Sequence, residues 1–99
     1  MQSLETIKST LANHKRELSE NYKIKEIGVF GSFVKGNQQN QSDVDILVEF
    51  EASADLSLLD FIGLENYLSE LLGAKVDLVE KQTLKPRIGR HVLDEVVRI

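Results

Sequence analysis

Apolar residues recur along the chain with two different periods, one typical of helices and the other of strands. From Ser3 to about Tyr22 they return every three to seven positions, which predicts an amphipathic helix. A second long helix is expected from about Ser57 to Leu72, where Gly73 is well placed to end it. Pro86 suits the first turn of a last helix, whose apolar stripe runs to the C-terminus. The apolar face of the second helix is expected to comprise Leu58, Leu59, Ile62, Leu68 and Leu71.

Shorter apolar runs between these helices predict strands at Lys25–Phe30, Asp43–Phe50 and Ala74–Val79. A short helical turn is expected after Gly31, before a polar loop over residues 37–41. The order of elements predicts one α/β (α+β) domain over residues 1–99, in which helices pack on one face of a small mixed sheet. A further short strand near Lys81 or in the polar loop is left open.

The second strand separates apolar from acidic side chains, because side chains alternate between the faces of a strand. The set expected to face the helices is Val44, Ile46 and Val48. The set on the other face is Asp43, Asp45, Leu47 and Glu49. Asp43 and Asp45 are therefore neighbours, roughly 7 Å apart along the backbone. Two such carboxylates repel unless a cation lies between them, and Mg²⁺ prefers oxygen ligands of this kind. Glu49 lies farther along the strand and is not expected to be a ligand.

A phosphate-binding turn is expected directly after the first strand. Gly31-Ser32 would lead from that strand into a short helix, where free backbone N–H groups suit a phosphate. Metal ligands and a phosphate cradle in one local unit suggest phosphoryl or nucleotidyl transfer. The alternatives are structural: Ser32 could simply cap the short helix, and Asp43 with Asp45 could be the charged edge of an exposed strand.

Asp77 lies in the middle of the third strand, which is otherwise apolar. An unpaired buried carboxylate is costly, so Asp77 needs either exposure on the surface of the strand or a cation. On the last helix, Arg87 and Arg90 could contact a phosphate or a partner, or could lie on a solvated face. His14 fills a gap in the apolar stripe of the first helix and is interpreted as a half-buried structural residue.

Two motifs stand close together in the chain: Gly31-Ser32-Phe33-Val34-Lys35-Gly36 and Ser42-Asp43-Val44-Asp45. Together with their spacing they resemble the signature of the DNA polymerase beta-like nucleotidyltransferases. Within that superfamily the chain is most similar to the minimal nucleotidyltransferases, the antitoxin partners of HEPN toxins. It departs from the usual pattern at Val34, which replaces Ala, and at Lys35, which replaces Arg and lacks the two-pronged geometry of a guanidinium.

The resemblance implies a polymerase beta-like palm core and transfer of AMP from ATP to a tyrosine hydroxyl on a HEPN toxin. It implies two Mg²⁺ ions, about 3.5–4 Å apart, held by Asp43 and Asp45. Asp77 matches a third carboxylate, which would complete the second metal site or accept a proton. Gly31 and Ser32 would hold the triphosphate, and Lys35 could contact phosphate or the partner.

Two other functions are compatible with the same motifs. The chain could be a non-catalytic antitoxin that neutralises its toxin by binding, or it could transfer a nucleotide to a small molecule with the help of a partner subunit. The sequence does not reveal whether homo- or hetero-oligomers form.

Composition narrows the choice further. A formal net charge of −4 argues against a broad surface for nucleic acid. The chain has no cysteine, which excludes disulfides and thiolate metal sites. It shows neither the apolar core of a signal peptide nor the run of about 20 apolar residues that a membrane span needs. We therefore expect a cytoplasmic protein that does not enter a membrane.

Overall fold

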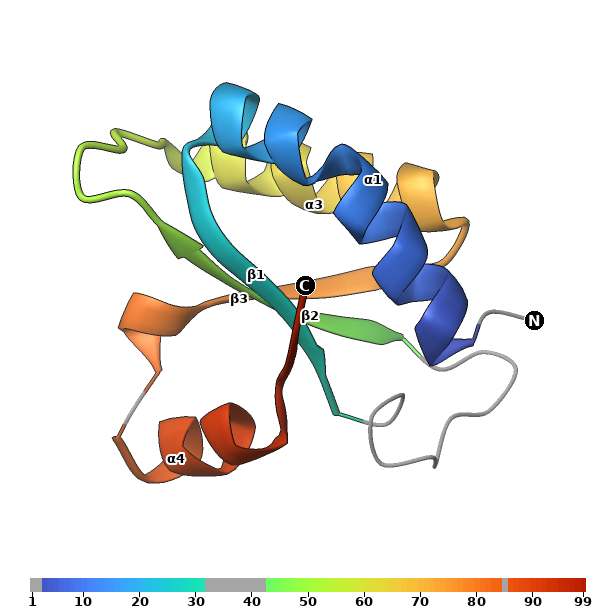
Figure 1. Cartoon of the computed structure of the whole chain (residues 1–99). Coiled ribbons are helices and arrows are strands. Elements are labelled where there is room, and N and C mark those ends of the chain that lie inside the picture. Colours follow the sequence, from blue (N-terminus) through green and yellow to red (C-terminus); the bar gives the residue numbers. More distant parts are fainter. Residues whose placement is uncertain (1–2, 32–42, 85) are drawn as a thin grey trace.

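The computed structural model describes residues 3–31, 43–84 and 86–99, without the side chains of residues 86–88 and 91. Helices and strands alternate along most of the chain (Figure 1). The helices are α1 (Leu4–Tyr22), α3 (Leu58–Leu72) and α4 (Pro86–Glu95), with a 3₁₀ turn, η1, at Lys81–Thr83. The strands are β1 (Ile24–Phe30), β2 (Val44–Phe50), β3 (Val76–Glu80) and β4 (Val97–Arg98). The three predicted strands and the first two predicted helices are thus confirmed.

The described strands form one four-stranded mixed sheet in the order β3-β2-β1-β4. β1 runs antiparallel to both β2 and β4, whereas β2 and β3 are parallel. The parallel pair is joined through α3, as a parallel connection requires a crossover. Because β2 and β3 are parallel, their N-terminal ends meet at the same end of the sheet. This topology confirms the expected small mixed sheet.

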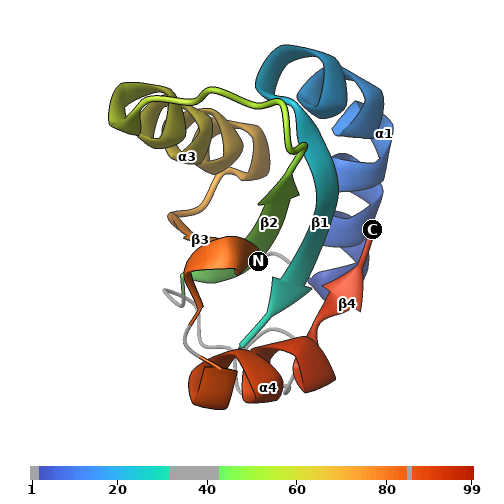
Figure 2. The same cartoon turned by 90° about the vertical axis from the view of Figure 1, so that its left-hand side faces the viewer.

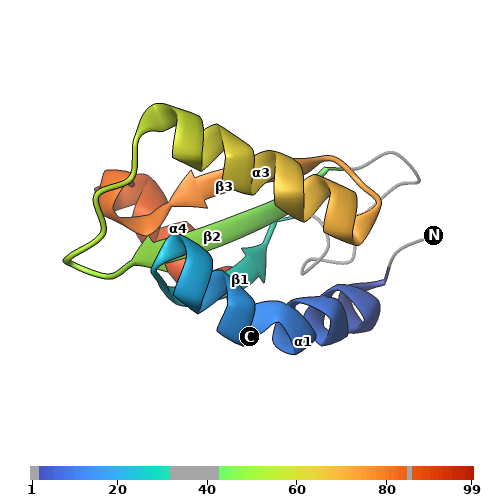
Figure 3. The same ribbon diagram turned by 90° about the horizontal axis from the view of Figure 1, so that it is seen from above.

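α1 and α3 lie side by side over one face of the sheet (Figure 3), and α4 lies on the opposite side (Figure 2). The core between the sheet and the two long helices is fully apolar, since the described residues include no buried polar or charged side chain. Its fully buried members come from both layers: Ile7, Leu11, Leu18, Val29, Val44, Ile46, Val48, Leu64 and Leu68. The alternation predicted for β2 is confirmed, because Val44, Ile46 and Val48 all belong to this core.

The ends of α1 and α3 are fixed by local hydrogen bonds. Ser3 caps α1, since its hydroxyl accepts the N–H of Thr6 at 3.2 Å. Ser57 and Asp60 form a reciprocal capping box at the start of α3, each accepting the backbone N–H of the other. Gly73 ends α3 in the left-handed conformation, with φ of 65°, as the sequence predicted.

Side chains of α3 also protect the outer edge of β3. The backbone N–H of Val76 donates to the Ser69 hydroxyl at 3.0 Å, and that of Leu78 donates to the Glu65 carboxylate at 3.0 Å. These two N–H groups alternate with the residues that bond to β2, so they point away from the sheet. The helix that crosses above the sheet therefore supplies hydrogen-bond acceptors to its edge strand.

The end of the chain differs from the prediction. The last helix ends at Glu95 instead of running to the C-terminus, and β4 follows it. β4 pairs with the outer edge of β1, and the Ile99 N–H donates to the Ile27 carbonyl at 3.0 Å. β4 and β1 are more than sixty residues apart in the chain, so their pairing leaves no local signal in the sequence. The apolar stripe therefore predicted a helix that is longer than the one observed. The open question near Lys81 is also settled, because a 3₁₀ turn lies there.

The predicted apolar face of α3 was partly wrong. Leu58, Leu59 and Ile62 are exposed, with 73%, 79% and 42% of their surfaces accessible. The buried stripe runs through Leu64 and Leu68, which are one helical turn apart. At 3.6 residues per turn, Leu59 lies two and a half turns before Leu68 and so points the opposite way.

No helix within the described ranges is long and apolar enough to cross a membrane.

Candidate functional site

Three carboxylates lie at one end of the sheet, on the face turned away from α1 and α3. Asp43 directly precedes β2 and Asp45 is its second residue. Asp45 and Asp77 are direct partners in the parallel register of β2 and β3, so their side chains project from the same face. On its other side Asp45 pairs with Phe30, the last residue of β1. The register therefore brings together the three acidic residues that the sequence singled out.

The three carboxylates differ in exposure. Asp43 and Asp45 are half-buried, and Asp77 is exposed. Exposure removes the energetic penalty that a buried carboxylate in an apolar strand would carry, so Asp77 needs no cation for the stability of the fold. It is also the carboxylate to which a second molecule has the easiest access.

Gly31 brings bare backbone against the Asp45 carboxylate. Its φ of 77° lies in the left-handed region, and a Cβ built on it would overlap the carboxyl group of Asp45. A residue with a side chain is thus disfavoured here both by conformation and by space. The consequence is a close contact between the Gly31 backbone and the Asp45 carboxyl, which only glycine permits at this position. Ser32 and Lys35, the other residues predicted to contact the nucleotide, lie outside the described residues.

Sequence reasoning missed one cation at this site. The Lys75 ammonium lies 3.9 Å from Oδ2 of Asp43, with both side chains substantially exposed. The Lys75 carbonyl also accepts the N–H of Val44 at 2.9 Å, which ties the start of β3 to the start of β2. Only the register reveals the pair: Val76 is the partner of Val44, so the residues before them are neighbours.

Glu49 shares the face of the carboxylates but is occupied elsewhere. Its Oε1 lies 3.4 Å from the Lys81 ammonium, and the two side chains are 22% and 31% exposed. Four residues along β2 separate Glu49 from Asp45, or about 13 Å. This placement agrees with the expectation that Glu49 is not a ligand at the site.

The described side chains supply only part of the ligand set that a cation such as Mg²⁺ requires. In the described part of the chain, no group of three or more acidic, histidine or cysteine side chains is gathered closely enough to hold a metal ion. Mg²⁺, however, is commonly bound by one or two carboxylates together with substrate phosphates, and seldom by a complete protein cage. Asp43 and Asp45 supply two carboxylates on one face, and the absence of a side chain at Gly31 makes room for the Asp45 carboxyl itself. The arrangement suits a metal that arrives with a nucleotide.

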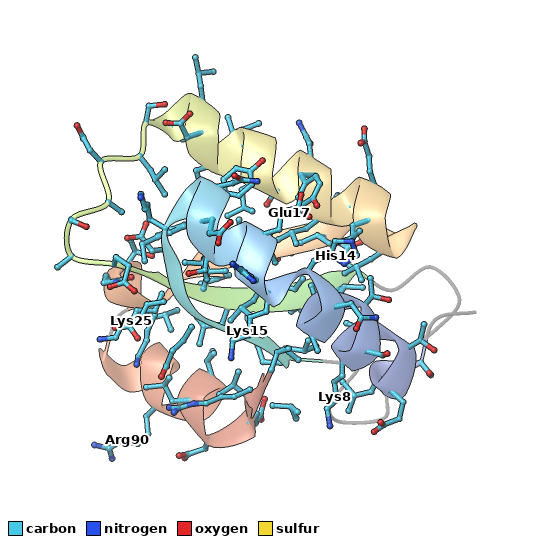
Figure 4. The ribbon with its side chains drawn as sticks, turned by 45° about the horizontal axis from the view of Figure 1, so that its top comes forward. Lys8, His14, Lys15, Glu17, Lys25 and Arg90 are labelled. Carbon is cyan, nitrogen blue, oxygen red and sulfur yellow. The ribbon has the colours of Figure 1, made fainter. Side chains whose placement is uncertain are left out.

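Other candidate residues lie away from this end of the sheet. Arg90 is exposed and projects from α4 away from the sheet (Figure 4), and the side chain of Arg87 lies outside the described set. Nδ1 of His14 lies 2.9 Å from the Thr10 carbonyl, one turn earlier on α1. This contact agrees with the structural interpretation of His14.

Comparison with known proteins tests the fold and the motifs together. The model of the nucleotidyltransferase domain family matches residues 11–99, which is most of the chain. The chain belongs to this family. A curated relative from Thermococcus cleftensis, protein adenylyltransferase MntA, is 54% identical over 99 residues, with 100% of this chain and 98% of the relative covered.

Solved structures agree with this assignment. A structure described as a minimal nucleotidyltransferase superposes with a TM-score of 0.81 at 34% identity, covering 99% of this chain and 97% of the other. A toxin–antitoxin complex with AMP-PNP contains a chain that superposes with a TM-score of 0.70 at 27% identity, covering 87% of this chain and 69% of that one. The nucleotidyltransferase fold expected from the two motifs is therefore confirmed.

Proposed function

We propose that this nucleotidyltransferase is a protein adenylyltransferase that acts as an antitoxin. It moves AMP from ATP to a tyrosine hydroxyl of a HEPN toxin. The observation that carries the proposal is the register that places Asp43, Asp45 and Asp77 together beside the bare backbone of Gly31. Support comes from the full-length similarity to an adenylyltransferase and from the similar chain in a toxin–antitoxin complex with AMP-PNP.

Asp43 and Asp45 would hold Mg²⁺ together with the phosphates of ATP. When bound, the metal supplies charge neutralisation of the triphosphate and lowers the pKa of the attacking hydroxyl. Gly31 lets the Asp45 carboxyl lie against the end of β1, where a side chain would displace it. Lys75 adds a positive charge beside Asp43, in reach of an anion at this end of the sheet.

Asp77 is exposed next to Asp45 and so faces the incoming acceptor. In the proposed reaction the acceptor oxygen forms a bond to the α-phosphorus of ATP. The bond from that phosphorus to the bridging oxygen breaks, and pyrophosphate leaves with the electron pair. Asp77 receives the proton of the hydroxyl, a role that is typically worth about 10²–10⁴-fold in rate.

Intact mass spectrometry of the toxin tests this function directly. The purified chain is incubated with the toxin, ATP and Mg²⁺, and the parent is compared with Asp45→Asn and Asp77→Asn. We expect the parent to add one or more AMP units and neither variant to do so at comparable protein ratios. Asp94→Asn, an exposed carboxylate on α4, serves as the matched control and should transfer normally.

A neutralisation assay separates transfer from simple masking. Parent and Asp77→Asn are titrated against a fixed amount of toxin, with and without ATP. Catalytic inactivation requires ATP and works below one mole of antitoxin per mole of toxin. Equal neutralisation by both proteins without ATP would contradict the proposal and assign the function to binding alone.

A further inference from the structure

An open, largely apolar cleft lies at the other end of the sheet from the three carboxylates. It has a volume of about 760 Å³, and its lining includes Phe50, Leu56, Leu58, Phe61, Leu78 and Glu80. Phe50 and Glu80 are the last residues of β2 and β3, whereas Asp45 and Asp77 lie near the starts of these strands. Five residue steps separate Asp45 from Phe50 along β2, or roughly 17 Å. Leu78 directly follows Asp77 but points to the opposite face of β3, so this part of the lining and the carboxylates lie on different faces of the sheet.

Exposed leucines extend this cleft onto the surface of α3. Leu58 belongs to the lining and is 73% exposed, and Leu59 beside it is 79% exposed. Ile62 continues the same apolar surface by one turn and is 42% exposed. The capping box of Ser57 and Asp60 fixes the backbone that carries the leucines, so the surface is ordered before any partner arrives. Figure 1 shows this start of α3 next to the loop that leaves β2.

Gly63 lies within this surface and has no structural role that the described residues explain. It follows Leu59 by one turn of α3, and a Cβ added to it would meet nothing within 4 Å. A glycine in the interior of a helix destabilises it relative to alanine. A helical glycine with open space above it, at the edge of the exposed apolar residues Leu59 and Ile62, provides a place where the backbone of another chain can approach closely.

Charge decides what kind of partner fits. The charged residues among the described lining of the cleft are Glu51 and Glu80, both acidic. Asp55 and Asp60 are exposed in the adjoining loop and at the start of α3. A second copy of the chain presenting the same surface would bring these carboxylates face to face, which is unfavourable. The complementary partner carries apolar side chains flanked by lysine or arginine.

We propose that Leu58, Leu59, Ile62 and Gly63, together with the adjoining cleft, form a docking surface for a segment of the toxin that is apolar and flanked by basic residues. This inference rests on the proposed function for the identity of the partner. The docking surface holds the toxin at one end of the sheet, and the carboxylates act on an acceptor hydroxyl at the other end. Affinity for the toxin and catalysis are thus carried by different residues.

Binding of the purified toxin without ATP, measured by isothermal titration calorimetry, tests the docking surface. Leu59→Lys should weaken toxin binding by at least about tenfold, as expected for a central apolar contact. Asn13→Lys gains the same residue at an exposed position of α1, outside the docking surface, and should bind within about twofold of the parent. Asp45→Asn should bind the toxin normally while failing to transfer AMP.

Gly63→Met provides a variant whose free form is not weakened. Methionine forms helices well and has open space here, so the melting temperature should rise while toxin affinity falls. Parent-like affinity of both Leu59→Lys and Gly63→Met would overturn the docking surface and leave the transfer chemistry untouched. If instead the parent alone dimerises in sedimentation and Leu59→Lys abolishes this, the surface belongs to a second copy and the proposal is wrong. A parent that binds the toxin but never modifies it contradicts only the proposed function.

Discussion

Gly31 holds its backbone directly against the carboxylate of Asp45, closer than any side chain at position 31 would permit. The contact joins the end of β1 to the start of β2 at the point where the proposed metal and triphosphate would meet. It gives a second structural reason for glycine at position 31, besides the turn that the sequence predicts there.

Gly31→Ala should lower both stability and nucleotide binding. The left-handed conformation alone costs a residue with a Cβ about 1–2 kcal/mol, and displacement of Asp45 adds to this. Gly63→Ala is the matched control, because the same change in open space on a helix should stabilise by about 1 kcal/mol or slightly less. Urea unfolding measures the stability of both variants, and titration with Mg-ATP measures nucleotide binding. Normal Mg-ATP binding by Gly31→Ala would show that the close contact is dispensable.

Asp45→Asn should strongly weaken Mg²⁺-dependent ATP binding. Asn keeps the size of Asp45 but lacks its negative charge, so the metal would lose one of its two proposed carboxylate ligands. Calorimetric titration with ATP, in the presence and absence of Mg²⁺, measures the loss. A variant that binds Mg-ATP as tightly as the parent would refute the metal role.

Lys75→Gln should strengthen the binding of Mg²⁺ alone. The ammonium lies 3.9 Å from Asp43 and competes with a metal for the same carboxylate. Both partners are exposed, and exposed pairs are weak, so the gain should not exceed about fivefold and should vanish at high salt. Mn²⁺, which prefers the same oxygen ligands, replaces Mg²⁺ in the measurement, because its binding can be followed by electron paramagnetic resonance without any turnover. Lys75→Arg keeps the charge and should behave as the parent; a gain in that variant too would argue against competition.

Tyr67 provides a pH-dependent test of the packing between α1 and α3. Its hydroxyl donates to the Glu17 carboxylate at 2.8 Å. This hydrogen bond is the main cause, and burial the second, of a pKa of Tyr67 raised above the ordinary value of 10.0. A raised pKa means that the stabilisation is present below the ordinary pKa and is lost as pH rises through the folded value. The parent should therefore lose more stability than Tyr67→Phe when the pH is raised from about 8 to about 11. Glu17→Gln should lower the pKa of Tyr67 in an ultraviolet titration; an unchanged titration would mean that the hydrogen bond does not exist in solution.

The strands and the acidic face of β2 could be predicted because their signals are local. Alternation over seven residues assigned Asp45 to one face and Ile46 to the other without knowledge of the fold. Asp77 required the resemblance, since the sequence alone does not say which strand lies beside β2. Lys75 required the register itself, because its contact with Asp43 joins residues that are far apart in the chain.

Two errors had different physical origins. β4 is only Val97–Arg98, too short for any periodicity, and it forms because β1 offers an unpaired edge. α3 carries leucines on all sides, so hydrophobicity could not distinguish the stripe that is buried from Leu58 and Leu59, which are not. Leu58 and Leu59, which the sequence predicted to be buried, form part of the proposed docking surface.

The edge strand β3 has a consequence for how this protein behaves at high concentration. Unpaired edge strands are templates onto which further strands can add, which leads to aggregation or fibrils. Here the Ser69 hydroxyl and the Glu65 carboxylate already accept the outward N–H groups of Val76 and Leu78. An incoming strand would have to displace both side chains before it could pair. The side chains of α3 thus occupy the edge of β3, and they prevent a strand of another molecule from extending the sheet on that side.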